Sequence, residues 1–338
     1  MAHSDALRYL VTGGAGFIGS HLTEHLLEDG HWVTVLDNLS TGRLENLAAV
    51  NGNPHLRIVE GDAADEQTLD REAAKADIII HFAAAVGVEL IVEQPLHSIE
   101  ANILVTEKVM RAAARHRCGV VIASSSEVYG KSEHAPFSEE DDLVLGPTKK
   151  ARWSYAATKM VGEFLALAYH KEFGLKTTVV RFFNTVGPRQ SDRYGMVVPR
   201  FVRQALRENP ITVYGEGSQS RCFCDVRDVV RAVAGLSRCD EAAGEVFNIG
   251  ATNEITIAQL AEKVRQATGS RSSIVRVPYD KAYEPGFEDI IRRVPNTAKV
   301  RNLLGWAPEI PFEDTLAAIV ERETSRLEED RPAVATGA

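Results

Sequence analysis

The chain has 338 residues and carries 38 lysines and arginines against 47 aspartates and glutamates, a net charge of −9. It contains no block of basic residues that could follow a nucleic-acid backbone and no apolar run as long as a membrane-spanning helix, so we expect neither nucleic acid nor a membrane as a partner. Its start lacks the basic and apolar regions of a signal peptide, which predicts a cytoplasmic location. The four cysteines show no zinc spacing, so we expect reduced thiols and no metal site.

The first predicted element is a buried strand that ends at Val11 and runs into a glycine-rich turn. Glycines at four positions let the backbone turn tightly, approach a pyrophosphate and pack closely against a helix: Gly13, Gly14, Gly16 and Gly19. Apolar residues recur at helical spacing from Phe17 and Ile18 onward, so the N–H groups at the start of this helix would face the anion. The pattern is typical of a dinucleotide-binding turn.

A second strand, Trp32 to Leu36, ends in Asp37, 18 residues after Gly19. A carboxylate at this place accepts hydrogen bonds from the adenosine ribose hydroxyls and repels a 2′-phosphate. The sequence therefore predicts NAD, not NADP, as the cofactor.

The first half of the chain continues to alternate apolar strands with helices, which indicates a parallel sheet covered on both faces. The further strands are predicted at Leu56 to Val59, Asp77 to Phe82, Gly119 to Ala123 and Thr177 to Phe182. Two long helices with broad apolar faces are predicted at Pro95 to Arg117 and Tyr155 to Phe173.

After residue 180 the predicted segments become short, at Ile211 to Tyr214, Cys222 to Cys224 and Val246 to Ile249. The fold class predicted is α/β: a Rossmann-type doubly wound parallel sheet with a smaller α/β substrate-binding lobe. We expect residues 1–180 to form the NAD-binding domain, continued by segments within 222–250. Residues 181–330 would build the smaller lobe, and 331–338 a disordered tail.

Tyr155 and Lys159 form a Y-x-x-x-K pattern, so their side chains share one face of the predicted helix. A tyrosine with a pKa of about 10 must lose about three units to act as a base near neutral pH, and a nearby ammonium supplies roughly that much. Upstream, the strand that ends at Ala123 runs into three serines and Glu127 at the sheet edge where ligands bind. We therefore predict Tyr155 as the base and Lys159 as the group that lowers its pKa.

These features resemble the extended short-chain dehydrogenase/reductase family, and within it the NAD-dependent nucleotide-sugar epimerases, dehydratases and decarboxylases. The resemblance covers Tyr9 to about Leu327, and its most specific motifs are TGGAGFIGSHL, LDNLSTG, SSSEVYG, YAATK, RFFNTVGPR, VYGEGSQSRCF and NLLGW. It implies a set of cofactor-binding residues: Gly13, Gly16, Phe17, Ile18, Gly19, Asp37, Asn38, Ser40, Asp62, Ala63, Phe82, Ala83, Ala84, Tyr155 and Lys159.

The resemblance also implies how a nucleotide sugar would be held. Ser125 matches the hydroxyl that steadies the sugar O4, Asn184 the substrate-positioning asparagine, and Arg221 the arginine that binds the diphosphate. Val213 and Tyr214 match the positions that pack a nucleobase, and Val198 is also placed in the substrate site.

The chain departs from the family where a further phosphate-binding arginine is usual. Glu284, Pro285 and Gly286 occupy that segment, so we expect Arg292 or Arg293 to take the role.

Within the family, the segments GPTKKARWSY, QSRCF and YEPGFEDIIRR resemble enzymes that act on UDP-glucuronate, both decarboxylases and 4-epimerases. Arg189 could hold the C6 carboxylate of this sugar. Three interpretations of Glu127 are open: with Ser126 it matches the serine–glutamate pair of decarboxylases, dehydratases use a glutamate there as an acid or base, and the carboxylate could also be purely structural.

A 4-keto uronate is a β-keto acid and loses CO₂ when its carboxylate aligns with the carbonyl π system, so an epimerase must hold that group near the ring plane. Because Ser125, Ser126 and Arg189 offer such donors, the sequence favours a UDP-glucuronate 4-epimerase that yields UDP-galacturonate. The alternatives are a UDP-glucuronate decarboxylase with a UDP-xylose or 4-keto-pentose product, a UDP-glucose 4-epimerase, and an NAD-binding scaffold without turnover. As in the family, the two long helices are expected to pair in a homodimer.

Overall fold

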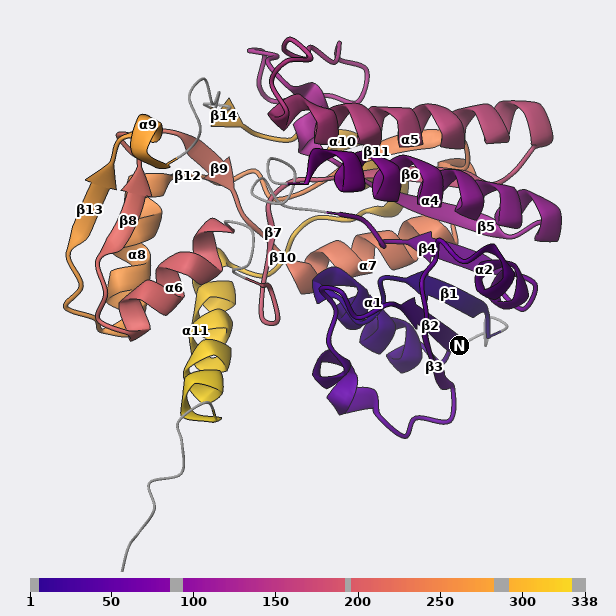
Figure 1. The fold of residues 1–338 in the computed structure, drawn as a ribbon, viewed down its shortest axis with the longest axis horizontal. Coiled ribbons are helices and arrows are strands. Elements are labelled where there is room, and N and C mark those ends of the chain that lie inside the picture. Colours follow the sequence, from indigo (N-terminus) through magenta and orange to yellow (C-terminus); the bar gives the residue numbers. More distant parts are fainter. Residues whose placement is uncertain (1–5, 86–93, 192–195, 283–291, 330–338) are drawn as a thin grey trace, which may run out of the picture.

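The computed structural model describes residues 6–85, 94–191, 196–282 and 292–329, which form a larger body with a smaller lobe beside it (Figure 1). The predicted tail 331–338 and the segment Glu284 to Gly286 lie outside the described residues.

A seven-stranded parallel sheet is the centre of the larger body, with the order β11-β6-β5-β4-β1-β2-β3. Its strands are β1 (Arg8–Thr12), β2 (Trp32–Asp37), β3 (Leu56–Glu60), β4 (Ile78–His81), β5 (Gly119–Ser125), β6 (Thr177–Phe182) and β11 (Glu245–Ile249). The strand order reverses between β1 and β4, and ligands bind at the carboxyl ends of the strands beside such a reversal. The predicted Rossmann-type sheet is confirmed.

Helices cover both faces of this sheet. In Figure 1, α4 (Pro95–His116) and α5 (Arg152–Phe173) lie side by side on one face, where α2 (Glu66–Ala73) packs against α4. On the other face α1 (Phe17–Glu28) packs against α7 (Val226–Ser237), and η1 (Leu44–Val50) packs against α1. With helices on both sides, the strands can be apolar throughout, as the sequence runs indicate.

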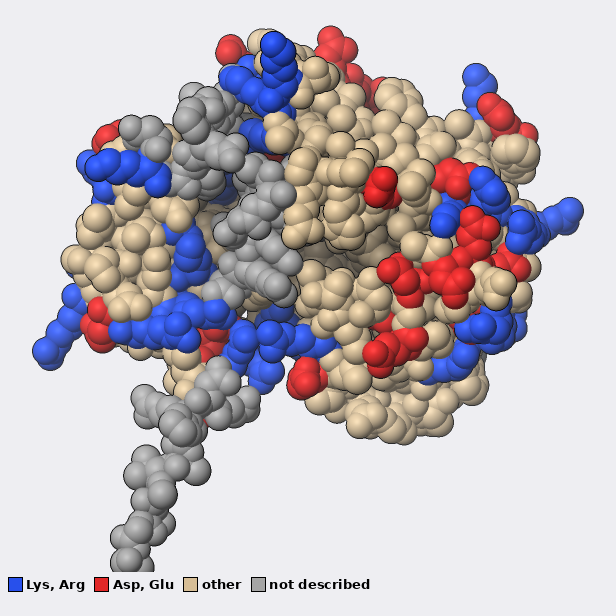
Figure 2. Space-filling view, in the orientation of Figure 1, with Lys and Arg blue, Asp and Glu red and all other residues tan. Residues whose placement is uncertain are grey.

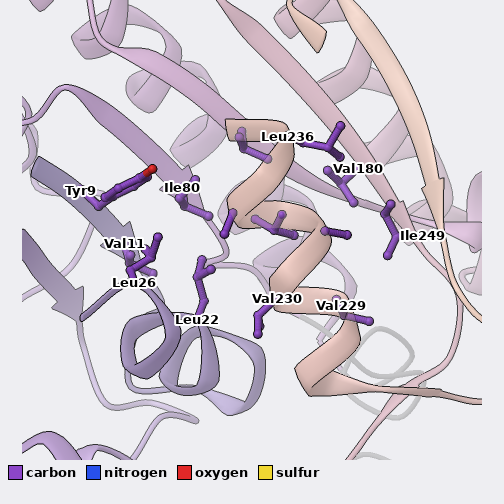
Figure 3. Packing of buried hydrophobic residues seen from close by; sticks show 14 of the residues in the cluster. Tyr9, Val11, Leu22, Leu26, Ile80, Val180, Val229, Val230, Leu236 and Ile249 are labelled. Atoms are coloured by element: carbon purple, nitrogen blue, oxygen red, sulfur yellow. The ribbon is translucent and has the colours of Figure 1, made fainter. Parts of the chain in front are cut away.

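The core is split by the sheet into two clusters. Tyr9 and Val11 of β1 point into one cluster with residues of α1 and α7, as Figure 3 shows, whereas Leu10 points into the other with residues of α4 and α5. This division follows from the strand period of two, which sends successive side chains to opposite faces.

The smaller lobe is built of short sheets and helices around its own core, which includes Phe201, Ile211 and Leu260. Its sheets are the parallel pair β8 (Ile211–Tyr214) and β13 (Ile274–Val277), and the three strands β12 (Glu254–Thr256), β9 (Ser220–Cys222) and β14 (Arg292–Arg293). Its helices are α6 (Val197–Leu206), α8 (Ile257–Thr268) and α11 (Phe312–Glu329).

The remaining short elements lie between the strands and helices named above. They are η2 (Ser126–Tyr129), β7 (Thr185–Val186), β10 (Cys224–Asp225), η3 (Asp240–Ala242), α9 (Tyr279–Ala282) and α10 (Ala298–Leu304). Besides the expected return within 222–250, α10 also packs back onto the larger body, against β11 and α7.

Most predicted elements are found within one to three residues, but one segment differs. Cys222 to Cys224 is not one strand, because Cys222 ends β9 and pairs antiparallel with Glu254, whereas Cys224 starts β10 and pairs parallel with Thr185. All four cysteines are unpaired with one another in the structure. None of the helices in the described parts of the chain is both long and apolar enough to cross a membrane.

Candidate active site

A cavity of about 1200 Å³, here called the interlobe cavity, extends from the carboxyl ends of the main sheet to the smaller lobe. Figure 2 shows lysine and arginine side chains gathered where the two bodies meet. The cavity is lined by all the predicted cofactor residues from Gly13 to Lys159 and by most of the predicted substrate residues.

The glycine turn leaves no room for side chains at two positions. Gly13 has a φ of +72°, and a Cβ there would lie 2.8 Å from the Ala83 nitrogen. A Cβ on Gly19 would lie 2.2 Å from the Gly13 carbonyl oxygen. Gly16 caps α1 without a side-chain hydrogen bond, so the first N–H groups of the helix face the cavity and fit a pyrophosphate.

Asp37 and Asp62 form the polar end of the cavity. The buried Asp37 carboxylate accepts hydrogen bonds from the backbone N–H groups of Ala15 (2.9 Å) and Leu39 (2.8 Å), which fix its orientation toward the cavity. Burial raises the pKa of this carboxyl group. Asp62 accepts from the Asn38 side chain (3.0 Å) and the Ala64 N–H (2.8 Å). These groups fit the adenosine ribose and adenine of NAD, as the sequence predicts.

Ser125, Tyr155 and Lys159 meet at the carboxyl end of β5. Tyr155 is 9% exposed, and the Lys159 ammonium lies 5.8 Å from the centre of its ring while donating a hydrogen bond to the Ala123 carbonyl oxygen (2.9 Å). Ser125 caps η2 by accepting from the Glu127 N–H (3.2 Å) and also hydrogen-bonds Tyr155.

The predicted lowering of the Tyr155 pKa by Lys159 is not found in the protein alone. Burial, and then the charge of Glu127, raise the pKa of Tyr155, although the hydrogen bond from Ser125 acts in the opposite direction. Burial also lowers the pKa of Lys159 to about 8. The sequence shows the spacing of the two side chains. It does not show how strongly burial disfavours the tyrosinate form of Tyr155 and the ammonium form of Lys159.

Glu127 is clamped between two arginines at the inner end of the cavity. Its carboxylate accepts hydrogen bonds from Arg293 (2.7 Å) and Arg152 (3.4 Å), and Arg293 also donates to the Ser126 hydroxyl (3.4 Å). Burial would raise the pKa of Glu127, but the two arginines hold it below its usual value, so the carboxylate is ionised. Arg152 is a site residue that the sequence reasoning missed, although it stands in the GPTKKARWSY segment, three residues before Tyr155.

The structure separates Arg292 from Arg293. Arg293 is buried and lines the interlobe cavity, whereas Arg292 points outward to the exposed Glu254, which it contacts at 2.5 to 3.1 Å. Neighbouring residues of a strand face opposite sides, which explains the difference. Arg293 pairs in register with Arg221, so two arginines of adjacent strands line the same wall.

Arg189 lines the interlobe cavity, but its guanidinium is held by residues of α1 and η1. Its guanidinium donates to both carboxylate oxygens of Glu24 (2.8 and 2.9 Å), to the Ser20 hydroxyl (3.2 Å) and to the Asn46 carbonyl (2.9 Å). These partners belong to α1 and η1, and the role of Arg189 as a donor to the sugar carboxylate stays a prediction.

The other predicted substrate residues differ in whether they line the cavity. Asn184, Val198 and Tyr214 line the interlobe cavity, and Arg200, which sequence reasoning missed, lies 4.2 Å from the centre of the Tyr214 ring. Val213 is absent from the lining, because the strand period turns its side chain into the core of the smaller lobe.

Comparison with known proteins shows the family of the chain. The family model described as GDP-mannose 4,6 dehydratase matches residues 10–319. The chain belongs to this family. It is therefore an NAD-dependent enzyme of the nucleotide-sugar epimerase, dehydratase and decarboxylase group within the short-chain dehydrogenases/reductases.

Three relatives show the range of this family. The UDP-N-acetyl-alpha-D-glucosaminuronate decarboxylase of Bacillus cytotoxicus is 40% identical over 93% of this chain and 97% of its own length. The UDP-glucose 4-epimerase of Thermotoga maritima, solved with UDP-glucose, has a TM-score of 0.85 and 30% identity over 95% of this chain and all of its own. The dTDP-glucose 4,6-dehydratase of Streptomyces venezuelae, solved with NAD, has a TM-score of 0.86 and 31% identity over 96% and 98%.

Proposed function

We propose that this enzyme is a UDP-uronate decarboxylase that acts through a 4-keto intermediate. The observation that carries the proposal is the ionised Glu127 carboxylate, clamped by Arg293 and Arg152 beside Tyr155. The relative from Bacillus cytotoxicus, a decarboxylase of a UDP-linked uronate, supports the same choice.

The first step is oxidation at C4 of the sugar. The chemistry that bound NAD supplies is the reversible acceptance of a hydride from C4. Tyr155 takes the proton of the 4-hydroxyl, and Ser125 holds the same oxygen. Because burial raises the Tyr155 pKa, the positive charge of Lys159 and that of an oxidised nicotinamide must act together to make Tyr155 a base.

The second step breaks the C5–C6 bond of the 4-keto uronate. CO₂ leaves, the bonding electron pair moves into the enolate formed by C5, C4 and O4, and a proton is then added at C5. A UDP-pentose would result once the hydride taken up in the first step is returned to C4 and Tyr155 gives its proton back to O4. The hydroxyls of Tyr155 and Ser125 can donate hydrogen bonds to the developing charge on O4.

The cluster around Glu127 suits this step. Two arginines attract the substrate carboxylate, whereas the fixed anion of Glu127 disfavours a second negative charge beside it. Loss of neutral CO₂ removes that repulsion, so the cluster favours the transition state over the bound uronate.

The 4-epimerase, which the sequence favoured, is the second candidate, and the similarity to a solved UDP-glucose 4-epimerase supports it. An epimerase that acts on a uronate needs donors that hold the carboxylate near the ring plane. Of the three predicted donors, Ser125, Ser126 and Arg189, the last is already paired with Glu24 of α1. For this reason we prefer the decarboxylase to the epimerase.

One experiment separates the two candidates. The purified enzyme with NAD is incubated with UDP-glucuronate and, separately, with UDP-N-acetylglucosaminuronate, and the anomeric proton signals are followed by NMR together with CO₂ release. We expect a UDP-pentose-type product and CO₂ from at least one substrate. A UDP-galacturonate-type product without CO₂ would show that the enzyme is the epimerase.

We also propose that the working form is a homodimer that buries the outer faces of α4 and α5. Large apolar side chains are exposed there, with Leu96 and Phe164 both 67% exposed. An exposed apolar surface of this kind on two adjacent helices is typical of a subunit interface.

A further inference from the structure

A buried ion pair lies directly behind Lys159. Glu163 follows Lys159 by four residues on α5, so the two side chains share one face of the helix. The Glu163 and Arg181 side chains are 6% and 5% exposed. Arg181, on β6, donates from Nε to one carboxylate oxygen (3.0 Å) and from Nη2 to the other (2.7 Å), a bidentate pairing that fixes the carboxylate in position.

The same carboxylate also joins α5 to the catalytic strand. The Ser124 hydroxyl donates a hydrogen bond to Glu163. On β5, Ser124 stands between Ala123, whose carbonyl accepts from Lys159, and Ser125, which hydrogen-bonds Tyr155. Glu163 therefore holds the strand that positions all three catalytic side chains.

The remaining donors of Arg181 are also used. Its Nη1 donates to the Tyr129 hydroxyl (2.9 Å) and the Glu139 carbonyl (3.1 Å), and Tyr129 donates to the Asn248 side chain (2.7 Å). Neither Glu163 nor Arg181 lines the interlobe cavity. The pair is therefore too far inside the protein to bind substrate.

Among the groups of the described residues that the electrostatics of Lys159 involve, the Glu163 carboxylate is the one that carries a negative charge. His81 on β4 faces Lys159 but is neutral, because burial lowers its pKa to about 3, and Tyr155 on the same helix is also neutral. Burial lowers the pKa of Lys159, and Glu163 acts against this effect. A buried ion pair is seldom more stabilising than apolar residues of the same size, so stability alone does not account for charges at this place.

We propose that Glu163 is a positioning residue for the reaction: its carboxylate, fixed by Arg181 and Ser124, keeps Lys159 protonated beside Tyr155. The inference rests on the proposed function only in that Lys159 and Tyr155 serve the oxidation at C4. It applies equally to the decarboxylase and the epimerase.

The direct test is the titration of Lys159 in the variant Glu163→Gln. Protein with lysines carrying an NMR label at Cε is loaded with NAD, and the Lys159 signal is assigned from its absence in Lys159→Met. We expect the titration midpoint to fall by about one to two pH units in Glu163→Gln, because the nearby negative charge is lost. This measurement needs no substrate, so it stands whether or not the proposed reaction is correct.

Turnover gives the second measurement. A deprotonated Lys159 no longer stabilises the ionised form of Tyr155, so the rate should fall as the pH rises through the Lys159 pKa. In Glu163→Gln this fall in rate should occur at a lower pH, displaced by the same amount as the Lys159 titration midpoint. Glu163→Asp keeps the negative charge, so its pH dependence should be close to that of the wild type. An unchanged Lys159 titration in Glu163→Gln would overturn the proposal.

Two controls separate the effect from loss of structure. Glu163→Gln leaves the buried Arg181 without its carboxylate partner and could unfold the protein. The double variant Glu163→Gln/Arg181→Gln removes both charges and provides a folded alternative. Its Lys159 titration midpoint should still lie below that of the wild type. Glu72→Gln removes another buried carboxylate, which pairs with Arg57 and Lys75 on the outer side of the larger body and away from the cavity. Glu72→Gln should lower the stability of the protein and leave the Lys159 titration midpoint unchanged. A shift of the Lys159 midpoint as large as that in Glu163→Gln would refute the role of Glu163.

Discussion

Tyr155 lies in surroundings that oppose its own ionisation, since burial and Glu127 both raise its pKa. Tyr155→Phe should abolish turnover, because the ring still packs but cannot accept the proton, and a loss of about a thousandfold is the scale for a removed acid/base group. Steady-state rates with UDP-glucuronate, together with the bound NAD content, check this. A variant with normal NAD content and a rate within tenfold of wild type would mean that another group is the base.

Glu127 is the residue on which the choice of reaction depends. If its anion drives CO₂ loss, Glu127→Gln should lower CO₂ release by about a hundredfold while the uronate binds at least as tightly, because Arg293 and Arg152 lose a competing partner. CO₂ release and the substrate Kd are the measurements. Glu254→Gln is the matched control, since Glu254 pairs with the neighbouring Arg292 outside the cavity. An unchanged rate of CO₂ release in Glu127→Gln would remove Glu127 from the mechanism.

At the scale of elements, the glycine turn between β1 and α1 depends on close backbone packing. Gly19→Ala should remove NAD binding, because its Cβ would lie 2.2 Å from the Gly13 carbonyl oxygen and would push the turn open. The matched control is Gly162→Ala on α5, where the new Cβ would meet the Thr106 methyl group at an ordinary 3.7 Å. Copurified NAD, measured by absorbance after denaturation, should be lost only in the first variant; retained NAD would contradict the tight fit.

The pair of long helices, α4 and α5, carries the proposed dimer interface. Phe164→Glu should convert a homodimer into a monomer, because it places a charge on the apolar face that the interface would bury. Light scattering at micromolar concentration gives the mass. Trp32→Glu alters another exposed aromatic residue, on β2, and should leave the dimer intact. A wild-type monomer under these conditions would refute the interface.

At the scale of the whole molecule, the Arg189–Glu24 pair joins the loop after β7 to α1. Arg189→Ala should lower the Tm by a few degrees, because a charge-assisted contact is worth roughly 1.5 to 3 kcal/mol. It should weaken UDP-glucuronate and UDP-glucose binding equally, and Glu24→Gln should behave in the same way. A loss of affinity confined to UDP-glucuronate would show that Arg189 binds the sugar carboxylate.

The sequence by itself determined the parts of this protein that depend on local spacing. The glycine turn, the alternation of strands and helices, Asp37 at the end of β2 and the shared face of Tyr155 and Lys159 all follow from residues close together in the chain. Repeating periods of two and 3.6 residues and the steric freedom of glycine act over such short stretches, so their outcome can be predicted before the fold is known.

Only the tertiary structure decided which distant side chains meet. Arg189 pairs with Glu24, Arg293 and not Arg292 reaches Glu127, and Glu163 pairs with Arg181 because the sheet order brings these segments together. The packing of β8 on the core of the smaller lobe decided which of its two faces is buried, so that Val213 lies in the core and Tyr214 faces the cavity. The pKa values of Tyr155 and Lys159 also depend on burial, which is a property of the packed molecule and not of the spacing between two residues.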